Sequence, residues 1–159
     1  MGPRANPRIM LLLAPVVYFA HILEEAPSFI GWFNSVVTPP MQDGNLVAMN
    51  APSIAITAIF AIVAAWTMRR GAMLILLAWL SYFMLANALF HVIATTVIGR
   101  YCPGLITAVL LYLPYFAWLV RYLRRDLHVR IEALAAAFCF GVPMLIQGYM
   151  IVFRGSTFF

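Results

Sequence analysis

The chain has 159 residues, of which 65% are hydrophobic and only 9% are charged, and its net charge is +5. A water-soluble domain carries roughly 25% charged residues, so lipid must form part of the solvent around this chain. All the basic residues are arginines that stand near the ends of hydrophobic runs, which is typical of membrane topology and excludes nucleic acid as a partner. We therefore expect an all-α integral membrane protein.

Five hydrophobic stretches of helical length predict a bundle of five transmembrane helices in one domain, residues 1–159. They cover residues 9–26, 51–68, 71–98, 103–123 and 131–153. The first stretch lacks a small-x-small cleavage site, so we expect a retained helix and not a signal peptide. Pro114 predicts a kink in the fourth helix, and Gly141 with Pro143 predicts one in the fifth.

Residues 27–50 form the one long connection, which carries Trp32 and Phe33. Aromatic side chains favour the membrane interface, so we expect a short interfacial segment whose two aromatic residues line a substrate pocket. The alternative is a plain connection. Cys102 and Cys139 form no CxxC pair, and we expect both to be unpaired packing residues.

The arginines predict the orientation of the helices. Only Arg100 and Arg154 flank one side. The other side carries Arg4, Arg8, Arg69, Arg70, Arg121, Arg124, Arg125 and Arg130. The positive-inside rule then places the amino terminus in the cytoplasm and the carboxyl terminus outside, in the inner (cytoplasmic) membrane of a cell. Five spans agree with termini on opposite sides, so residues 27–50 become an outer loop.

The first predicted helix carries His21, Glu24 and Glu25, an unusual set for a membrane span. Spacings of three and four residues put His21 on the same helix face as both carboxylates. In the third predicted helix, Asn87 and His91 are four residues apart and also share a face. We predict these five residues as catalytic, because ionisable side chains inside a membrane are costly and usually functional.

Depth along the helices brings these residues into one layer. At 1.5 Å per residue, His21 lies about 20 Å from Arg8, and His91 lies about 13 Å before Arg100, so both fall in the outer half. The same layer holds further predicted pocket-lining residues, namely Tyr18, Asn50, Thr57, Thr107 and Gln147. The alternative is that these polar side chains form interhelical hydrogen bonds or reach the lipid headgroups.

Residues 21–25, His-Ile-Leu-Glu-Glu, resemble the motif that names the HXXEE family of small bacterial and archaeal membrane proteins. Residues 87–91 and 101–104, followed by Thr107, resemble the second conserved block of that family. The resemblance spans the chain from the first to the fourth predicted helix. It implies that these residues matter to the family, and it implies no particular reaction.

Three functions are compatible with the polar layer. In the first, His21, Glu25 and His91 form a two-histidine, one-carboxylate set that binds zinc or non-haem iron in an enzyme. In the second, a carboxyl group and a histidine catalyse a metal-free isomerisation or cyclisation of a lipid. In the third, the protein is not catalytic and serves lipid binding, transport or assembly.

We rank an enzyme above a non-catalytic protein, and a metal-dependent enzyme slightly above a metal-free one. The expected partner is a membrane lipid or another hydrophobic small molecule. The sequence leaves open whether the chain forms a homo-oligomer.

Overall fold

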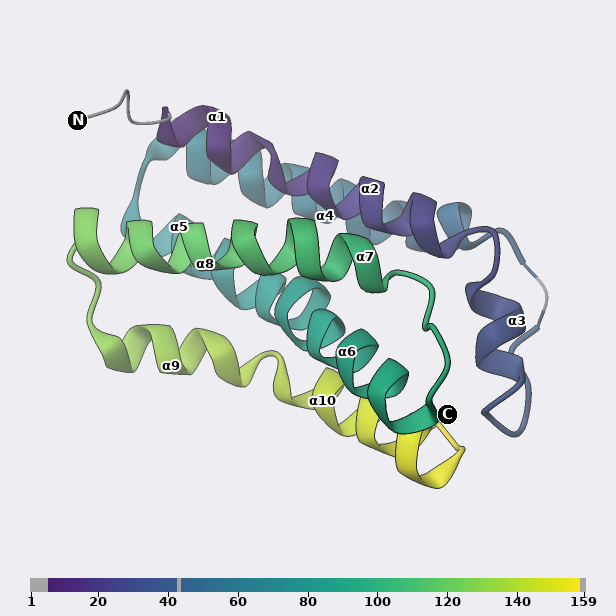
Figure 1. The fold of residues 1–159 in the computed structure, drawn as a ribbon. Coiled ribbons are helices and arrows are strands. Elements are labelled where there is room, and N and C mark those ends of the chain that lie inside the picture. The colour runs from purple at the N-terminus through teal and green to yellow at the C-terminus, as the bar shows by residue number, and fades with distance from the viewer. Residues whose placement is uncertain (1–5, 43, 158–159) are drawn as a thin grey trace.

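The computed structural model describes residues 6–42 and 44–157, and every regular element in these two ranges is a helix (Figure 1). Four helices are long and apolar enough to cross a membrane, at Pro7–Glu25, Leu46–Thr67, Arg70–Ile98 and Leu105–Asp126. A fifth candidate span is the pair Ile131–Cys139 and Val142–Arg154, which is bent by 43°. The predicted all-α class is confirmed, with four to five candidate membrane spans.

Breaks and π-helical turns divide these spans into shorter elements. The first span consists of α1 (Pro7–Leu12) and α2 (Ala14–Glu25), and the second is α4 (Leu46–Thr67). The third consists of α5 (Arg70–Leu80), the π-helical turn η1 (Ser81–Ala86) and α6 (Asn87–Ile98). The fourth contains α7 (Leu105–Thr107), η2 (Ala108–Tyr112), α8 (Leu113–Arg121) and η3 (Tyr122–Asp126). The last contains α9 (Ile131–Cys139), α10 (Val142–Tyr149) and η4 (Met150–Arg154).

Helix α4 begins earlier than the sequence predicts. The Asn45 side chain accepts a hydrogen bond from the N–H of Ala48 at 3.1 Å, and this cap starts the helix at Leu46. Pro52 consequently lies inside the helix, whereas we had predicted a helix that begins at residue 51 with this proline in its first turn. The predicted loop 27–50 is therefore shorter than expected.

Both predicted kinks coincide with irregular helix geometry. Pro143 lies in the first turn of α10 at the 43° bend, which confirms the kink in the last span. Gly141 lies at the same bend, where a Cβ atom would stand 2.7 Å from the backbone oxygen of Ser81. Pro114 lies in the first turn of α8, directly after the π-helical turn η2.

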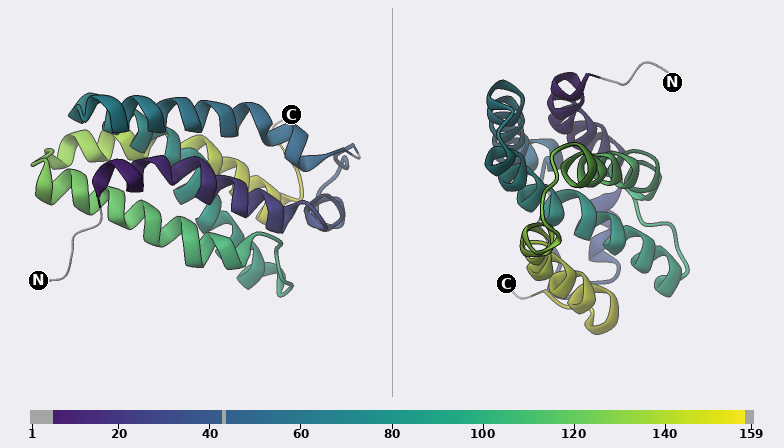
Figure 2. Two further views of the ribbon diagram at one scale, coloured as in Figure 1. Left: turned by 90° about the horizontal axis from the view of Figure 1, so that it is seen from above. Right: turned by 90° about the vertical axis from the view of Figure 1, so that its left-hand side faces the viewer.

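The third span is the centre of the bundle. In its most apolar window 56% of the residues are buried, against 17–28% in the other three continuous spans. Helix α5 packs between α4 and α9, and α6 packs against α10 (Figure 2). The fully buried residues of this span include Leu76, Leu77, Leu80, Met84 and Ala88. Residues of the third span are therefore shielded from lipid more than those of its neighbours.

The connection after the first span folds back over one end of the bundle. It contains the short helix α3 (Phe29–Asn34), which lies across that end (Figure 1). Phe33 packs with Phe90, Cys102 and Ile151 in a small second core. The N–H of Thr38 donates to the carbonyl of Gly155 at 2.9 Å. The connection is thus docked onto the bundle.

Arginines are concentrated at the opposite end. The start of α1, the connection from α4 to α5 and the connection from η3 to α9 lie together there (Figure 1). Together with the last turns of the fourth span, these segments hold seven of the eight arginines predicted on one side, while Arg4 lies outside the described residues. Arg100 and Arg154 belong to the segments at the other end. The structure therefore separates the arginines by end, as the sequence predicts.

Candidate metal centre

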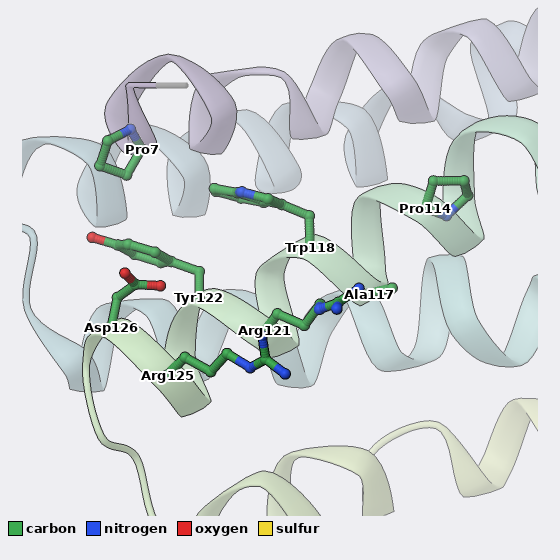
Figure 3. Close-up of a pocket in the computed structure, with 8 residues that line it drawn as sticks. All are labelled: Pro7, Pro114, Ala117, Trp118, Arg121, Tyr122, Arg125 and Asp126. Atoms are coloured by element: carbon green, nitrogen blue, oxygen red, sulfur yellow. The ribbon is translucent and has the colours of Figure 1, made fainter. Parts of the chain in front are cut away.

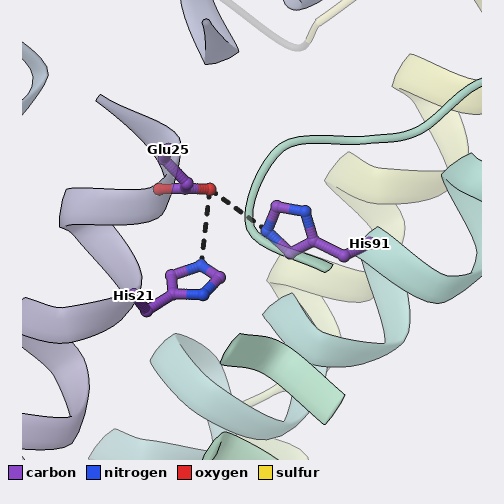
Figure 4. Close-up of side chains that lie close together, drawn as sticks. All are labelled: His21, Glu25 and His91. Atoms are coloured by element: carbon purple, nitrogen blue, oxygen red, sulfur yellow. Dashed lines mark ion pairs between the residues drawn. The ribbon is translucent and has the colours of Figure 1, made fainter. Parts of the chain in front are cut away.

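Two histidines and one carboxylate meet between the first and third spans (Figure 4). The Nε2 atom of His91 lies 3.1 Å from Oε1 of Glu25, and Nε2 of His21 lies 3.4 Å from the same oxygen. Both histidines are fully buried, and Glu25 is 5% exposed. The three potential ligand atoms lie within 4.8 Å of one another, so this group could hold a metal ion.

Local helix geometry explains why these side chains converge. His21 and Glu25 are four residues apart on α2, so they share one face of that helix. His91 belongs to α6, which follows the π-helical turn η1. A π-helical turn adds a residue to a helix and changes which side chains face a neighbour downstream, and such turns are frequent at functional sites. The face that holds His91 is therefore set partly by η1.

Thr107 connects His21 to Glu24. Its Oγ1 atom lies 2.5 Å from Oε2 of Glu24 and 2.8 Å from Nδ1 of His21. Glu24 accepts two further backbone hydrogen bonds at this site, so it acts as an acceptor and the hydroxyl proton of Thr107 points toward it. The hydroxyl must then accept the Nδ1 proton of His21, and Nε2 is the ring nitrogen that faces Glu25.

Glu24 is held away from the His21–Glu25–His91 group. It accepts from the N–H groups of Ile106 at 3.1 Å and Thr107 at 2.8 Å, at the start of the fourth span. The Tyr101 hydroxyl also donates to Glu24. Burial and the Glu24 carboxylate raise the pKa of Tyr101 to about 12, so this phenol stays a donor at neutral pH. The two adjacent glutamates therefore have different surroundings, and Glu24 is not among the three potential ligands.

Cys102 contacts Nδ1 of His91, the ring nitrogen that does not face Glu25. Its Sγ atom lies 3.2 Å from Nδ1 of His91, and the residue is fully buried. Burial raises the pKa of the Cys102 thiol, so the group remains a neutral thiol. We had predicted both cysteines as packing residues. Both are unpaired, and Cys139 is exposed, but Cys102 in addition orients a histidine.

Gly104 closes over the three potential ligands. Its φ is +101°, a conformation that favours glycine. A Cβ atom at this position would lie 2.7 Å from Cε1 of His91, 2.8 Å from Cε1 of His21 and 3.0 Å from Cγ of Glu25. Because glycine has no Cβ atom, the backbone at residue 104 covers the three side chains more closely than it could with any other amino acid at this position.

Tyr112 lies beside His21, and Asn87 lies one helical turn before His91 on α6. The ring of Tyr112 lies 4.3 Å from the ring of His21 between centroids, and the two are tilted by 34°. Among the described residues, the Tyr112 hydroxyl and Oδ1 of Asn87 are buried without a hydrogen-bond partner. The Nε2 atoms of His21 and His91 also lack a hydrogen bond, although each lies at ion-pair distance from Glu25. The remaining buried side-chain atom without a hydrogen-bond partner in the described part of the chain is Nε1 of Trp32.

Several of the predicted pocket-lining residues form hydrogen bonds between or within helices. The Tyr18 hydroxyl donates to Oδ1 of Asn50 at 3.1 Å, which connects the first and second spans. Thr57 accepts from Nε1 of Trp79 at 2.8 Å and donates to the carbonyl of Ser53 at 2.7 Å. Asn50 and Thr57 are thus used in contacts between and within helices, outside the three-residue group.

The aromatic residues of α3 differ in how close they lie to the His21–Glu25–His91 group. Phe29 contacts the His91 ring at 6.1 Å, and Trp32 packs edge-on against Phe90 at 6.1 Å between ring centroids. Phe33 and Gln147 line a groove of about 320 Å³ whose lining contains none of the three potential ligands.

Four residues near the cluster were absent from the predicted site residues, namely Tyr101, Cys102, Gly104 and Tyr112. The first three belong to the second block of the family resemblance, which was the available signal. Tyr112 belongs to neither block of the family resemblance. Helical spacing from Thr107 could not place it either, because η2 interrupts the regular helical period between the two residues.

The donor set fits a first-row divalent metal. Zinc binds imidazole nitrogen and carboxylate oxygen at about 2.0–2.2 Å, so the ligand atoms of a tetrahedral site stand about 3.3–3.6 Å apart. The two separations that involve Glu25, 3.1 and 3.4 Å, are close to this range. Three protein ligands leave a coordination position open, as in catalytic zinc sites and two-histidine, one-carboxylate iron sites.

Fold and site together define a helical protein with four to five candidate membrane spans and a buried His–Glu–His group between two of them. A family model described as "Protein of unknown function with HXXEE motif" matches residues 12–119, which include all three residues of the group. The chain belongs to this family, and the predicted family is confirmed. A search of curated proteins and a search of solved structures each returned no match.

Proposed function

We propose that this chain is an integral membrane metalloenzyme that binds one zinc or iron(II) ion through His21, Glu25 and His91. Its substrate is a lipid or another hydrophobic small molecule. The amino terminus lies in the cytoplasm and the carboxyl terminus outside, so that the metal centre lies in the outer half of the inner membrane. This orientation follows from the separation of the arginines by end.

The observation that carries the proposal is the convergence of two imidazole nitrogens on one buried carboxylate, which brings three potential ligand atoms within 4.8 Å of one another. The contact of Nδ1 with Thr107 leaves Nε2 as the nitrogen of His21 that faces Glu25. A buried carboxylate is costly unless a positive charge compensates it. A divalent ion would satisfy the three donors at once.

A role in catalysis is supported by the open coordination position and the polar atoms around it. When bound, such an ion acts as a Lewis acid or lowers the pKa of a coordinated water. Tyr112 and Asn87 would orient a polar group of the substrate, because their buried oxygen atoms have no partner among the described residues. The lipid-facing helices favour a substrate that partitions into the bilayer.

Metal analysis of the detergent-purified full-length protein tests this proposal. We expect about one zinc or iron per chain, lost in His21→Ala and in His91→Ala. His128→Ala is the matched control, because His128 is exposed and outside the group. Circular dichroism verifies that each variant remains helical. Folded, metal-free wild-type protein that does not take up added zinc or iron would overturn the proposal and favour the metal-free acid–base alternative.

A further inference from the structure

A second feature lies at the arginine-rich end of the bundle, away from the His–Glu–His group. A groove of about 850 Å³ runs between the start of α1 and the last turns of the fourth span (Figure 3). Pro7 forms one side, and Trp118, Tyr122, Arg121 and Arg125 line the other. The groove therefore combines apolar, aromatic and cationic surfaces at the end of a membrane span.

The aromatic part of the groove is a flat wall. The rings of Trp118 and Tyr122 are stacked, with centroids 5.6 Å apart and planes only 7° from parallel. Both residues are half-buried. Paired Trp and Tyr rings are typical of the depth at which lipid headgroups meet acyl chains. This wall can lie against the glycerol region of a lipid.

The cationic part of the groove is formed by Arg121 and Arg125. Both residues are exposed, and Figure 3 shows their side chains extending along the same side of the helix. Asp126 also lines the groove, so two arginines and one aspartate leave a net charge of +1. Guanidinium groups bind phosphate through paired hydrogen bonds. Charge complementarity therefore favours an anionic occupant over a zwitterionic one.

We propose that this groove binds an anionic phospholipid, whose phosphate is held by Arg121 and Arg125 and whose glycerol backbone lies on the Trp118–Tyr122 stack. Basic pockets beside membrane helices at the cytoplasmic surface are suited to anionic headgroups. The site is independent of the proposed metal centre, and its occupant is a lipid of the surrounding leaflet. Tight binding there would hold the start of α1 against the fourth span.

Native mass spectrometry of the full-length protein tests the site. The protein is titrated in detergent with phosphatidylglycerol or phosphatidylcholine of the same acyl length. We expect preferential retention of phosphatidylglycerol. In the double variant Arg121→Gln/Arg125→Gln this affinity should fall about 25-fold, since each arginine near an anionic lipid contributes about a factor of five. The metal content should remain unchanged, which separates this test from that of the proposed function.

Arg69→Gln/Arg70→Gln is the matched control. It removes the same charge at the same end of the bundle, but neither residue lines the groove. We expect this variant to retain phosphatidylglycerol as the wild type does. An equal loss in both double variants, or no preference for phosphatidylglycerol in the wild type, would overturn the proposal. Displacement of the lipid by millimolar inorganic phosphate would assign the site to free phosphate instead.

Discussion

Replacing Gly104 with alanine should disturb the candidate metal centre directly, because the added methyl group would meet all three potential ligands. The new Cβ would lie 2.7 and 2.8 Å from the Cε1 atoms of His91 and His21 and 3.0 Å from Cγ of Glu25. Each Cε1 atom is bonded to the Nε2 atom that faces the carboxylate. The clash therefore moves the potential ligands themselves.

The magnitude follows from two separate terms. Gly104 has a φ of +101°, and a left-handed conformation costs a residue with a side chain about 1–2 kcal/mol. Extra volume in a packed interior costs typically about 1–3 kcal/mol. We therefore expect Gly104→Ala to lower the free energy of unfolding by about 2–5 kcal/mol and to reduce the metal content of the purified protein.

Gly99→Ala separates these terms. Gly99 also has a positive φ, +71°, but nothing lies within 4 Å of its Cβ position. This control should show only the backbone cost of about 1–2 kcal/mol and an unchanged metal content. Thermal unfolding in detergent and elemental analysis measure both quantities. If Gly104→Ala behaved like Gly99→Ala in both assays, the close contact of the backbone with the three side chains would be refuted.

Three further predictions concern the residues around the potential ligands. Thr107→Val should lower metal affinity about 10- to 100-fold, which is the usual effect of losing a partner that orients a ligand. Thr107→Ser keeps the hydroxyl and should restore the affinity. Competition with a chelator measures the metal affinity of both variants. Cys102→Ala should weaken metal binding in the same assay, whereas Cys139→Ala should not, since only Cys102 contacts a histidine; equal effects would contradict this role. Because burial and Glu24 raise the pKa of Tyr101 to about 12, the stabilisation from its phenol is complete below about pH 10 and is lost as the pH rises through the folded pKa. The difference in melting temperature between wild type and Tyr101→Phe should therefore shrink above about pH 10, and a constant difference would exclude this contribution.

The three potential ligands could be predicted from the sequence because they are rare in their surroundings. His21 and Glu25 share a helix face at a spacing of four, and His91 lies at a similar depth in another apolar span. The roles of Glu24 and Glu25 could not be separated in this way. Spacings of three and four both reach His21, and only contacts with residues 101–107 show which carboxylate faces the cluster.

Depth along a span leaves the facing direction of a side chain open. Asn50 and Thr57 lie in the predicted layer, and their side chains form hydrogen bonds between and within helices. A residue's distance along a span fixes its height in the membrane and leaves its rotation about the helix axis undetermined. The π-helical turns add to this uncertainty, because η2 shifts the register between Thr107 and Tyr112.

The order of the residues along the chain determines when each part of the cluster is synthesised. The His–Glu–His group is complete once the third span has been synthesised, but Cys102, Gly104 and Thr107 emerge only afterwards, with the fourth. Until that helix docks, the imidazoles lack the partners that orient them and the backbone that covers them. Loading of an ion during this interval would require no opening of the finished bundle, and docking of the fourth span would then enclose it.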